Sequence, residues 1–304
     1  MPHLIIRHLT EYSYRQPVAL GEHRIMMRPR ESFDQRLVSA KLEITPQPAE
    51  LRWLHDVFGN SVAIASFGAL ARNLRVESTV HLDHEPIAGA SVDIEPYARR
   101  FPFTYSSEDM PDLLRSIERA YLDPGRIIDD WARTFVGLDR SADTLGMLVN
   151  MTQTIRRDFT YIPRHEKGTQ SPIETLQRRQ GTCRDFAVLM IEAVRSVGFA
   201  ARFVSGYVYD PDCGTGRVGG GNTHAWVRIF LPGSGWVEFD PTNGIVGNSG
   251  LIRVAIARDP YQAVPLSGLW TGYPGSNLGM SVEVDIRLSG AAPPPHGATN
   301  TRFG

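Results

Sequence analysis

The segment that decides the fold is Gly181-Thr182-Cys183-Arg184-Asp185-Phe186-Ala187. Thr182 followed three residues later by Asp185 is a capping-box pattern, with aspartate in place of the more usual glutamate, so a helix is expected to start here. The following positions are apolar on nearly every side, which favours a buried, central helix over residues 182–197. Gly198 stands where a left-handed residue commonly ends a helix.

Cys183 would be the first residue of this helix, a position that favours an anion. Unpaired backbone N–H groups and the helix dipole stabilise negative charge there, which lowers the pKa of a thiol. Arg184 would act in the same direction if it pointed toward the sulfur, whereas Asp185 is expected to cap the helix rather than to enter chemistry. The alternative is a buried structural cysteine, because free cysteine is among the most buried residue types.

A histidine and an aspartate are expected on one β-hairpin farther along the chain. Residues 224–230 and 236–240 alternate between apolar and polar, and Leu231-Pro232-Gly233-Ser234-Gly235 between them is typical of a turn. A three-residue loop that pairs Phe230 with Ser234 would place His224 directly opposite Asp240. Their Cβ atoms would then lie about 5 Å apart, within reach of a hydrogen bond.

Together, these three residues suggest nucleophilic catalysis. A carboxylate on one imidazole nitrogen fixes the tautomer and leaves the other nitrogen to take a proton from a nucleophile. Cys183, His224 and Asp240 would then be the nucleophile, the base and the residue that orients the base. Taken singly, His224 could be an ordinary strand-end histidine and Asp240 part of a turn.

The periodicity of the chain predicts an α+β protein. Residues 37–45 and 74–82 alternate as strands do, so residues 1–100 are expected to form a β-sandwich-like or barrel-like domain. A catalytic core is expected over residues 101–288, where the central helix packs on an antiparallel sheet, followed by a disordered tail over 289–304. Helices are predicted around residues 113–121, 144–157 and 173–177, and strands over 201–209, 225–230, 236–240 and 281–288.

Composition excludes several classes of protein. Hydrophobic residues make up 42% of the 304 residues, too many for a wholly disordered chain. The 32 Lys and Arg nearly cancel the 33 Asp and Glu, so neither nucleic acid nor a membrane is expected as a partner. The N-terminus lacks the apolar region of a signal peptide, and a cytoplasmic location is expected.

No cofactor or metal is expected. Gly214-Thr215-Gly216-Arg217-Val218-Gly219 matches the dinucleotide fingerprint, but a strand rather than the required helix should follow it. Cys183, Cys213 and His224 lack the spacing of a zinc site, although a bridge between the two cysteines is formally possible. Residues 164–167 hold one histidine among mixed charges and are interpreted as a solvated loop.

The chain resembles the bacterial type of the transglutaminase-like superfamily. The match runs through residues 180–187, 198–207, 223–227 and 236–242, and the opening residues 8–14 resemble the β-rich N-terminal module of that family. The resemblance covers about residues 5–288. It implies a papain-like core with Cys183 as thiol nucleophile, His224 as general base and Asp240 as orienting carboxylate.

The resemblance also implies an activity. An enzyme of this type transfers an acyl group from an amide bond of a peptide or protein through a thioester, and we favour hydrolysis over transfer from glutamine to an amine. A binding or assembly protein without turnover is the alternative from a different class. Beside the Cys183 backbone N–H, Tyr161 and Gln180 are candidates for stabilising the oxyanion. Trp226 is a candidate for positioning substrate, with a place in the core or cleft wall as the alternative.

Overall fold

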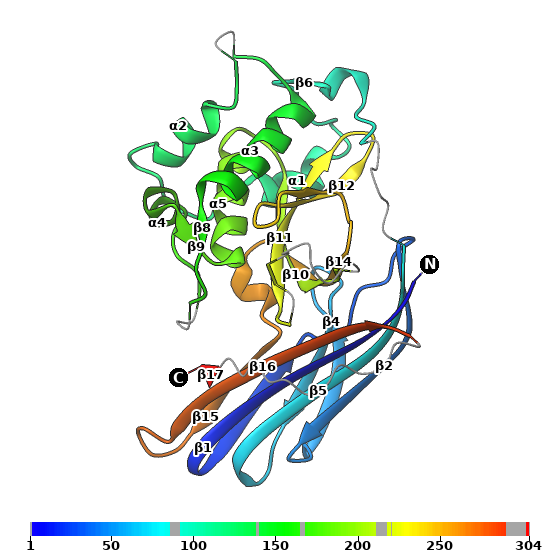
Figure 1. Ribbon diagram of the computed structural model, residues 1–304, viewed down its shortest axis with the longest axis vertical. Helices are drawn as coiled ribbons and strands as arrows, with labels where there is room; N and C mark the ends of the chain where they lie inside the picture. Colours follow the sequence, from blue (N-terminus) through cyan, green and yellow to red (C-terminus); the bar gives the residue numbers. More distant parts are fainter. Residues whose placement is uncertain are drawn as a thin grey trace.

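The computed structural model describes residues 2–85, 92–137, 140–164, 168–210, 218–219, 221–289 and 302–303. Figure 1 shows two parts, a layer of long strands that holds the N-terminus and, beside it, helices packed on a second, smaller sheet. This is the predicted α+β architecture.

The long strands form one eight-stranded sheet organised around β1 (His3–Ile25). Its pairing with β5 is irregular between Ser13 and Val18, and the strand changes partners there. The first half pairs with β5 (Leu70–His84) and β16 (Asn277–Leu288), and the second half with β4 (Ser61–Ser66) and β15 (Leu266–Thr271). The outer strands are β2 (Gln35–Thr45) on β5, β3 (Glu50–His55) on β4 and β17 (Arg302–Phe303) on β16.

This sheet buries a cluster of apolar side chains, so the N-terminal region is rich in β-strands as predicted. Alternate residues of each strand face inward, as the period of two requires. The buried members of this core are Tyr14, Val18, Leu20, Ile25, Met27, Ala63, Ala65, Leu74, Val76 and Leu266.

The C-terminal strands correct the predicted domain limits. Strands β15 and β16 pair with β1, so residues 266–288 belong to the N-terminal sheet and not to the core range 101–288. Alternation identified residues 281–288 as a strand, but alternation does not tell which sheet accepts it. Most of the predicted disordered tail, residues 290–301 and 304, lies outside the described residues.

The smaller sheet is antiparallel and has the order β13-β12-β11-β10-β14. Its strands are β10 (Ala201–Val208), β11 (His224–Leu231), β12 (Gly235–Asp240), β13 (Ile245–Val246) and β14 (Leu251–Ala257). The helices are α1 (Met110–Ile117), α2 (Ile127–Arg133), α3 (Thr144–Asp158), α4 (Pro172–Arg178) and α5 (Cys183–Ser196). Helix α5 packs against β10 and β11, with α2, α3 and α4 around it. Short strands pair as β6 (Arg100–Phe101) with β7 (Ala142–Asp143) and β8 (Thr160–Tyr161) with β9 (Gln180–Gly181), and two 3-10 helices cover Pro96–Ala98 and Pro260–Ala263.

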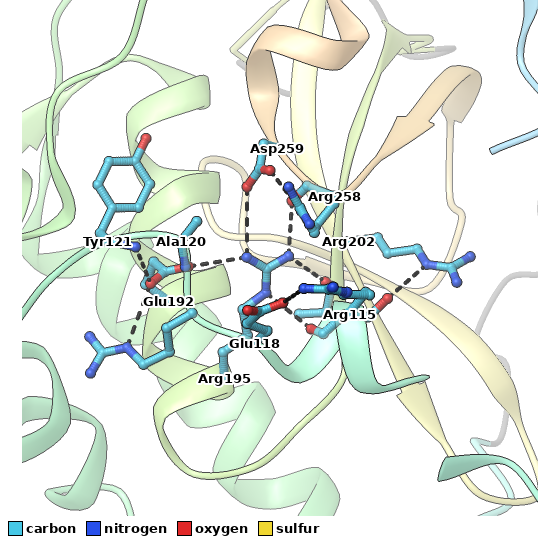
Figure 2. A network of polar contacts seen from close by, with 12 residues as sticks. Arg115, Glu118, Ala120, Tyr121, Glu192, Arg195, Arg202, Arg258 and Asp259 are labelled. Atoms are coloured by element: carbon cyan, nitrogen blue, oxygen red, sulfur yellow. Dashed lines mark hydrogen bonds and ion pairs between the residues drawn. The ribbon is translucent and has the colours of Figure 1, made fainter. Parts of the chain in front are cut away.

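A buried ion pair fixes the far end of α5. Figure 2 shows Arg195 and Glu192 at the centre of a polar network. The Glu192 carboxylate accepts the backbone N–H groups of Ala120 and Tyr121 at 3.1 and 3.2 Å. Arg195 donates to the carbonyl oxygens of Ser116, Ala201 and Arg258. Both charges are therefore satisfied, and the helix that begins at Cys183 is held rigidly at its other end.

Side chains of the N-terminal part cover the outer edge of β14. The amide of Gln35 accepts the N–H of Arg253 at 2.9 Å and donates to its carbonyl at 2.8 Å. Asn60 makes the same pair of bonds with Ile256, at 2.9 and 2.7 Å. The two amides replace a neighbouring strand, so the edge of the core sheet carries satisfied backbone groups.

Among the helices of the described residues, none combines the length and hydropathy that crossing a bilayer requires.

Candidate active site

Helix α5 begins as the sequence predicts. The Thr182 hydroxyl accepts the Asp185 N–H at 3.4 Å, and the Asp185 carboxylate accepts the Thr182 N–H at 2.8 Å, which completes the capping box. Cys183 is the first residue of the helix, and it is buried and free of any disulfide. At this position its backbone N–H has no carbonyl partner within the helix.

Asp185 serves the helix start and a neighbouring segment together. Its fully buried carboxylate also accepts the N–H of Gln170 at 2.7 Å and an Nη2 hydrogen bond from Arg164 at 3.0 Å. Arg164 therefore departs from the predicted solvated loop, because its guanidinium reaches the buried helix cap; residues 165–167 of that loop lie outside the described residues.

The hairpin that carries His224 forms, but the predicted register was wrong. Phe230 pairs with Trp236 rather than with Ser234, because the loop consists of residues 232–234. The Ser234 N–H donates to the Leu231 carbonyl, and Gly233 has a positive φ of 91°, as the third residue of a type II turn after proline requires.

The two-residue shift keeps His224 and Asp240 on one face of the sheet as diagonal neighbours. Long side chains reach each other across such a diagonal. His224 Nε2 lies 2.8 Å from Asp240 Oδ2, and both side chains are fully buried. The predicted contact is therefore present although the pairing that predicted it is not.

The histidine directs its other nitrogen toward the thiol. With Nε2 taken by Asp240, Nδ1 is buried and has no well-aligned hydrogen-bond partner among the described residues. Burial alone would lower the pKa of His224, but the charge and hydrogen bond of Asp240, together with Cys183, raise it to about 10. Burial likewise opposes ionisation of Cys183, yet the hydrogen bond and charge of His224, Arg184 and the Ala225 N–H bring the thiol pKa below its ordinary value. The pair favours thiolate and imidazolium.

The turn after β12 holds the Asp240 carboxylate in place. Oδ1 accepts the backbone N–H groups of Thr242 and Asn243, and Oδ2 accepts a hydrogen bond from Asn243 Nδ2 at 2.8 Å. Burial would raise the pKa of Asp240, but the charge and hydrogen bond of His224, followed by the hydrogen bonds from the Asn243 side chain and the Thr242 N–H, lower it. Sequence reasoning missed Asn243; the available signal was an amide three residues after the aspartate, in a segment read only as a turn.

The three secondary candidates lie in different surroundings. Tyr161 is paired through β8 with Gly181, two residues before Cys183, and burial together with the Cys183 charge raises its pKa to about 12. Gln180 is half-buried on β9 beside Thr160. Trp226 is fully buried in the sheet core and stacks on His224, with ring centroids 6.0 Å apart. Its position supports the core alternative and not contact with substrate.

The structure gives no support to the dinucleotide-binding or zinc-binding patterns considered in the sequence. His224 opens a strand after the glycine-rich segment, whereas the dinucleotide fingerprint requires a helix; residues 214–217 and Cys213 themselves lie outside the described residues. Within the described ranges, no group of three or more acidic, cysteine or histidine side chains is arranged to hold a metal ion.

Comparison with known proteins places the chain in a family. A model of the bacterial transglutaminase-like N-terminal region matches residues 4–83, and one of the transglutaminase-like superfamily matches residues 130–241. An uncharacterized protein of Mycobacterium tuberculosis is 30% identical over 92% of this chain and 91% of its own length. The chain belongs to the transglutaminase-like superfamily. The resemblance seen in the sequence is therefore confirmed, and the matched core range contains Cys183, His224 and Asp240.

Two further matches extend the comparison. An uncharacterized protein of Mycobacterium leprae is 27% identical over 91% of this chain and 96% of its own length. The solved structure of a presumed cysteine protease from Cytophaga hutchinsonii has a TM-score of 0.68 at 17% identity and covers 99% of this chain and 96% of that one. This structural likeness shows a shared fold, a papain-like core joined to a sheet-rich N-terminal region.

Gly206 in β10 pairs with His224 in β11. It allows the neighbouring backbone and side chains to approach closely at this point. A Cβ at this position would lie 2.0 Å from the Ile252 carbonyl oxygen and 2.7 Å from the Trp226 ring. We expect Gly206→Ala to lower the free energy of unfolding by about 1–3 kcal/mol, since backbone must move to admit the methyl group. Urea unfolding measures this.

Gly146→Ala is the matched control for Gly206→Ala. This helical position has only ordinary contacts, the nearest at 3.6 Å, so alanine should be neutral or stabilising there. Equal stability of Gly206→Ala and the wild type would contradict the close approach of β10 and β14.

Proposed function

We propose that this protein is a thiol-dependent acyl-transfer enzyme that hydrolyses amide bonds of peptides or proteins, with Cys183 as nucleophile, His224 as acid and base, and Asp240 as the orienting carboxylate. The observation that carries the proposal is the 2.8 Å contact between His224 Nε2 and Asp240 Oδ2, which leaves Nδ1 for a cysteine at a helix start. Membership of the transglutaminase-like superfamily supports it.

The first half-reaction consumes the amide. The Cys183 thiolate attacks the carbonyl carbon, a C–S bond forms, and the carbonyl electron pair moves to oxygen. The Cys183 N–H, which has no carbonyl partner within α5, would stabilise this oxyanion, and Tyr161 is the nearby side-chain candidate. Collapse breaks the C–N bond while His224 Nδ1 gives its proton to the departing amine, which leaves a thioester and a neutral imidazole.

The second half-reaction resolves the thioester. His224 Nδ1 takes a proton from water as the oxygen attacks, and the C–S bond then breaks to restore the thiolate and imidazolium. We favour water as acceptor because it is more abundant than any amine. An amine in its place would give transamidation of glutamine. A reducing, cytoplasmic compartment is the proposed location, since the mechanism needs a free thiol.

A product analysis tests the choice of acceptor. We would incubate the protein with unfolded protein substrates and a labelled primary amine, and measure new amino termini, released ammonia and incorporated amine by mass spectrometry. We expect new amino termini with little incorporated amine, because water resolves the thioester. The variant Cys183→Ser sets the background.

The other outcomes separate the alternatives. Incorporation that exceeds hydrolysis would overturn the preference for water in favour of transamidation. Products equal to those of Cys183→Ser would contradict amide chemistry on these substrates and favour a binding protein.

A further inference from the structure

One side chain outside the three proposed catalytic residues contacts both the Asp240 carboxylate and the backbone beside His224. Asn243 Nδ2 donates to Asp240 Oδ2 at 2.8 Å and lies 3.4 Å from His224 Nε2. The same amide forms hydrogen bonds with both backbone groups of residue 218. Its Oδ1 accepts the Val218 N–H at 2.8 Å, and its Nδ2 donates to the Val218 carbonyl at 3.1 Å.

The backbone next to Val218 lies against the imidazole of His224. A Cβ on Gly219 would lie 2.8 Å from His224 Nδ1 and 3.0 Å from Cγ, so only a residue without a side chain fits beside the ring. Gly219 also has a φ of 109°, which favours glycine independently. Holding Val218 therefore fixes the neighbour of the nitrogen that faces the thiol.

We propose that Asn243 is a positioning residue of the active site, which acts through Asp240 and through the Val218–Gly219 backbone to hold His224 in the orientation that ionises Cys183. An amide suits this position because one planar group supplies a donor to the carboxylate while its oxygen and nitrogen pair with a backbone N–H and carbonyl. An aspartate would lack the donor when ionised, and an alkyl side chain would satisfy none of these groups.

The inference rests on the proposed function, because its readout is the ionisation of Cys183 by His224. Among the described residues, the titratable or charged groups around this pair are Arg184 from α5, Tyr161 from β8 and Asp240 from β12. Substitution of Asn243 removes none of these groups, so a changed thiol titration would report their arrangement.

The experiment measures how the rate of iodoacetamide labelling of Cys183 depends on pH, in a Cys213→Ser background. We expect Asn243→Ala to raise the midpoint of the profile by about one pH unit and to slow labelling below the midpoint about tenfold, since one unit is a tenfold change in ionisation. Gln153→Ala is the matched control. Its amide donates to the Gly244 carbonyl in the same turn at 2.8 Å, and among the described residues it makes no hydrogen bond to Asp240 or Val218, so its profile should match the wild type.

The outcomes are distinguishable from failure of the proposed function. If the wild type itself labels like an ordinary thiol, the proposed function fails. If the wild type labels at low pH and folded Asn243→Ala does the same, or if Gln153→Ala shifts equally, the positioning role is refuted. Should the alanine variant not fold, Asn243→Ser keeps a turn-forming side chain but lacks the second polar atom, and the same shift is expected of it.

Discussion

His224→Ala should make iodoacetamide labelling of Cys183 at pH 5 about a hundredfold slower. An ordinary thiol with a pKa of about 8.5 is only about 0.03% thiolate at pH 5, whereas His224 lowers the pKa of Cys183 and so raises its thiolate fraction at this pH. The lower intrinsic nucleophilicity of a low-pKa thiolate offsets part of that difference. The ionised thiolate of the wild type should label at a nearly constant rate down to the pKa of the pair, while the rate of the variant should fall tenfold for each pH unit.

The slope of the profile is the decisive measurement, because it does not depend on nucleophilicity. His55→Ala, which removes an exposed histidine of β3, should retain the wild-type profile. Parallel profiles for the wild type and His224→Ala would show that the histidine does not ionise the thiol, and the acyl-transfer proposal would be lost with it.

Arg253→Met should lower the free energy of unfolding by about 3–5 kcal/mol. Arg253 is buried between the two parts of the molecule, where Nη1 donates to Asp34 Oδ2 at 3.0 Å and to Glu238 Oε1 at 3.1 Å. Methionine fills similar space but leaves the Asp34 carboxylate buried without its arginine, and removing one partner of a buried pair costs this much. Thermal unfolding should show a fall of roughly 10 °C for a chain of this size.

Acid adds a second readout for the same pair. Burial would raise the pKa of Asp34, but Arg253, Ser32 and Asn248 together lower it to about 2. A carboxyl whose folded pKa is depressed contributes stability above its unfolded pKa of about 4, and that contribution is lost as the pH falls toward 2. The Met variant should lose this dependence between pH 4 and 2.

Arg52→Met is the surface control, since its pair with Glu22 is exposed and should contribute less than about 1 kcal/mol. An equally small loss for Arg253→Met would show that the buried cluster relaxes without its arginine.

The site could be predicted from local signals because its residues obey local rules. The capping box at Thr182 and Asp185 depends on a three-residue spacing, so the helix start was predicted correctly. The hairpin register depends on which residues form the loop, and Pro232-Gly233 permits more than one choice. The predicted register was wrong by two positions, and a shift of two leaves His224 and Asp240 on the same face of the sheet. The predicted contact between them is present for that reason. Asn243 was missed although it follows Asp240 by only three residues, because the Val218 backbone that its amide also binds meets this turn only in three dimensions.

The fold was less predictable where contacts are distant in the chain. The second half of β1 and the whole of β15 carry no simple alternation, because the strand bends and changes partners. Strand β14 is buried on both faces and reads as a continuous apolar run broken by Arg253. The amides of Gln35 and Asn60 lie about 200 residues from the backbone they cover, and nothing in their own neighbourhood indicates that role.

The pairing of β1 with β16 bears on the order in which the molecule can be assembled during synthesis. Strand β1 has one edge, from Leu4 to Tyr14, covered by residues of β16 that are made more than 260 positions later. Every strand of the core sheet and the helix that carries Cys183 are translated between these two segments. The core that carries Cys183 can therefore be complete while the edge of β1 that faces β16 is still unpaired, a state prone to association with other chains. Completion of the sheet around β1 therefore waits for β16.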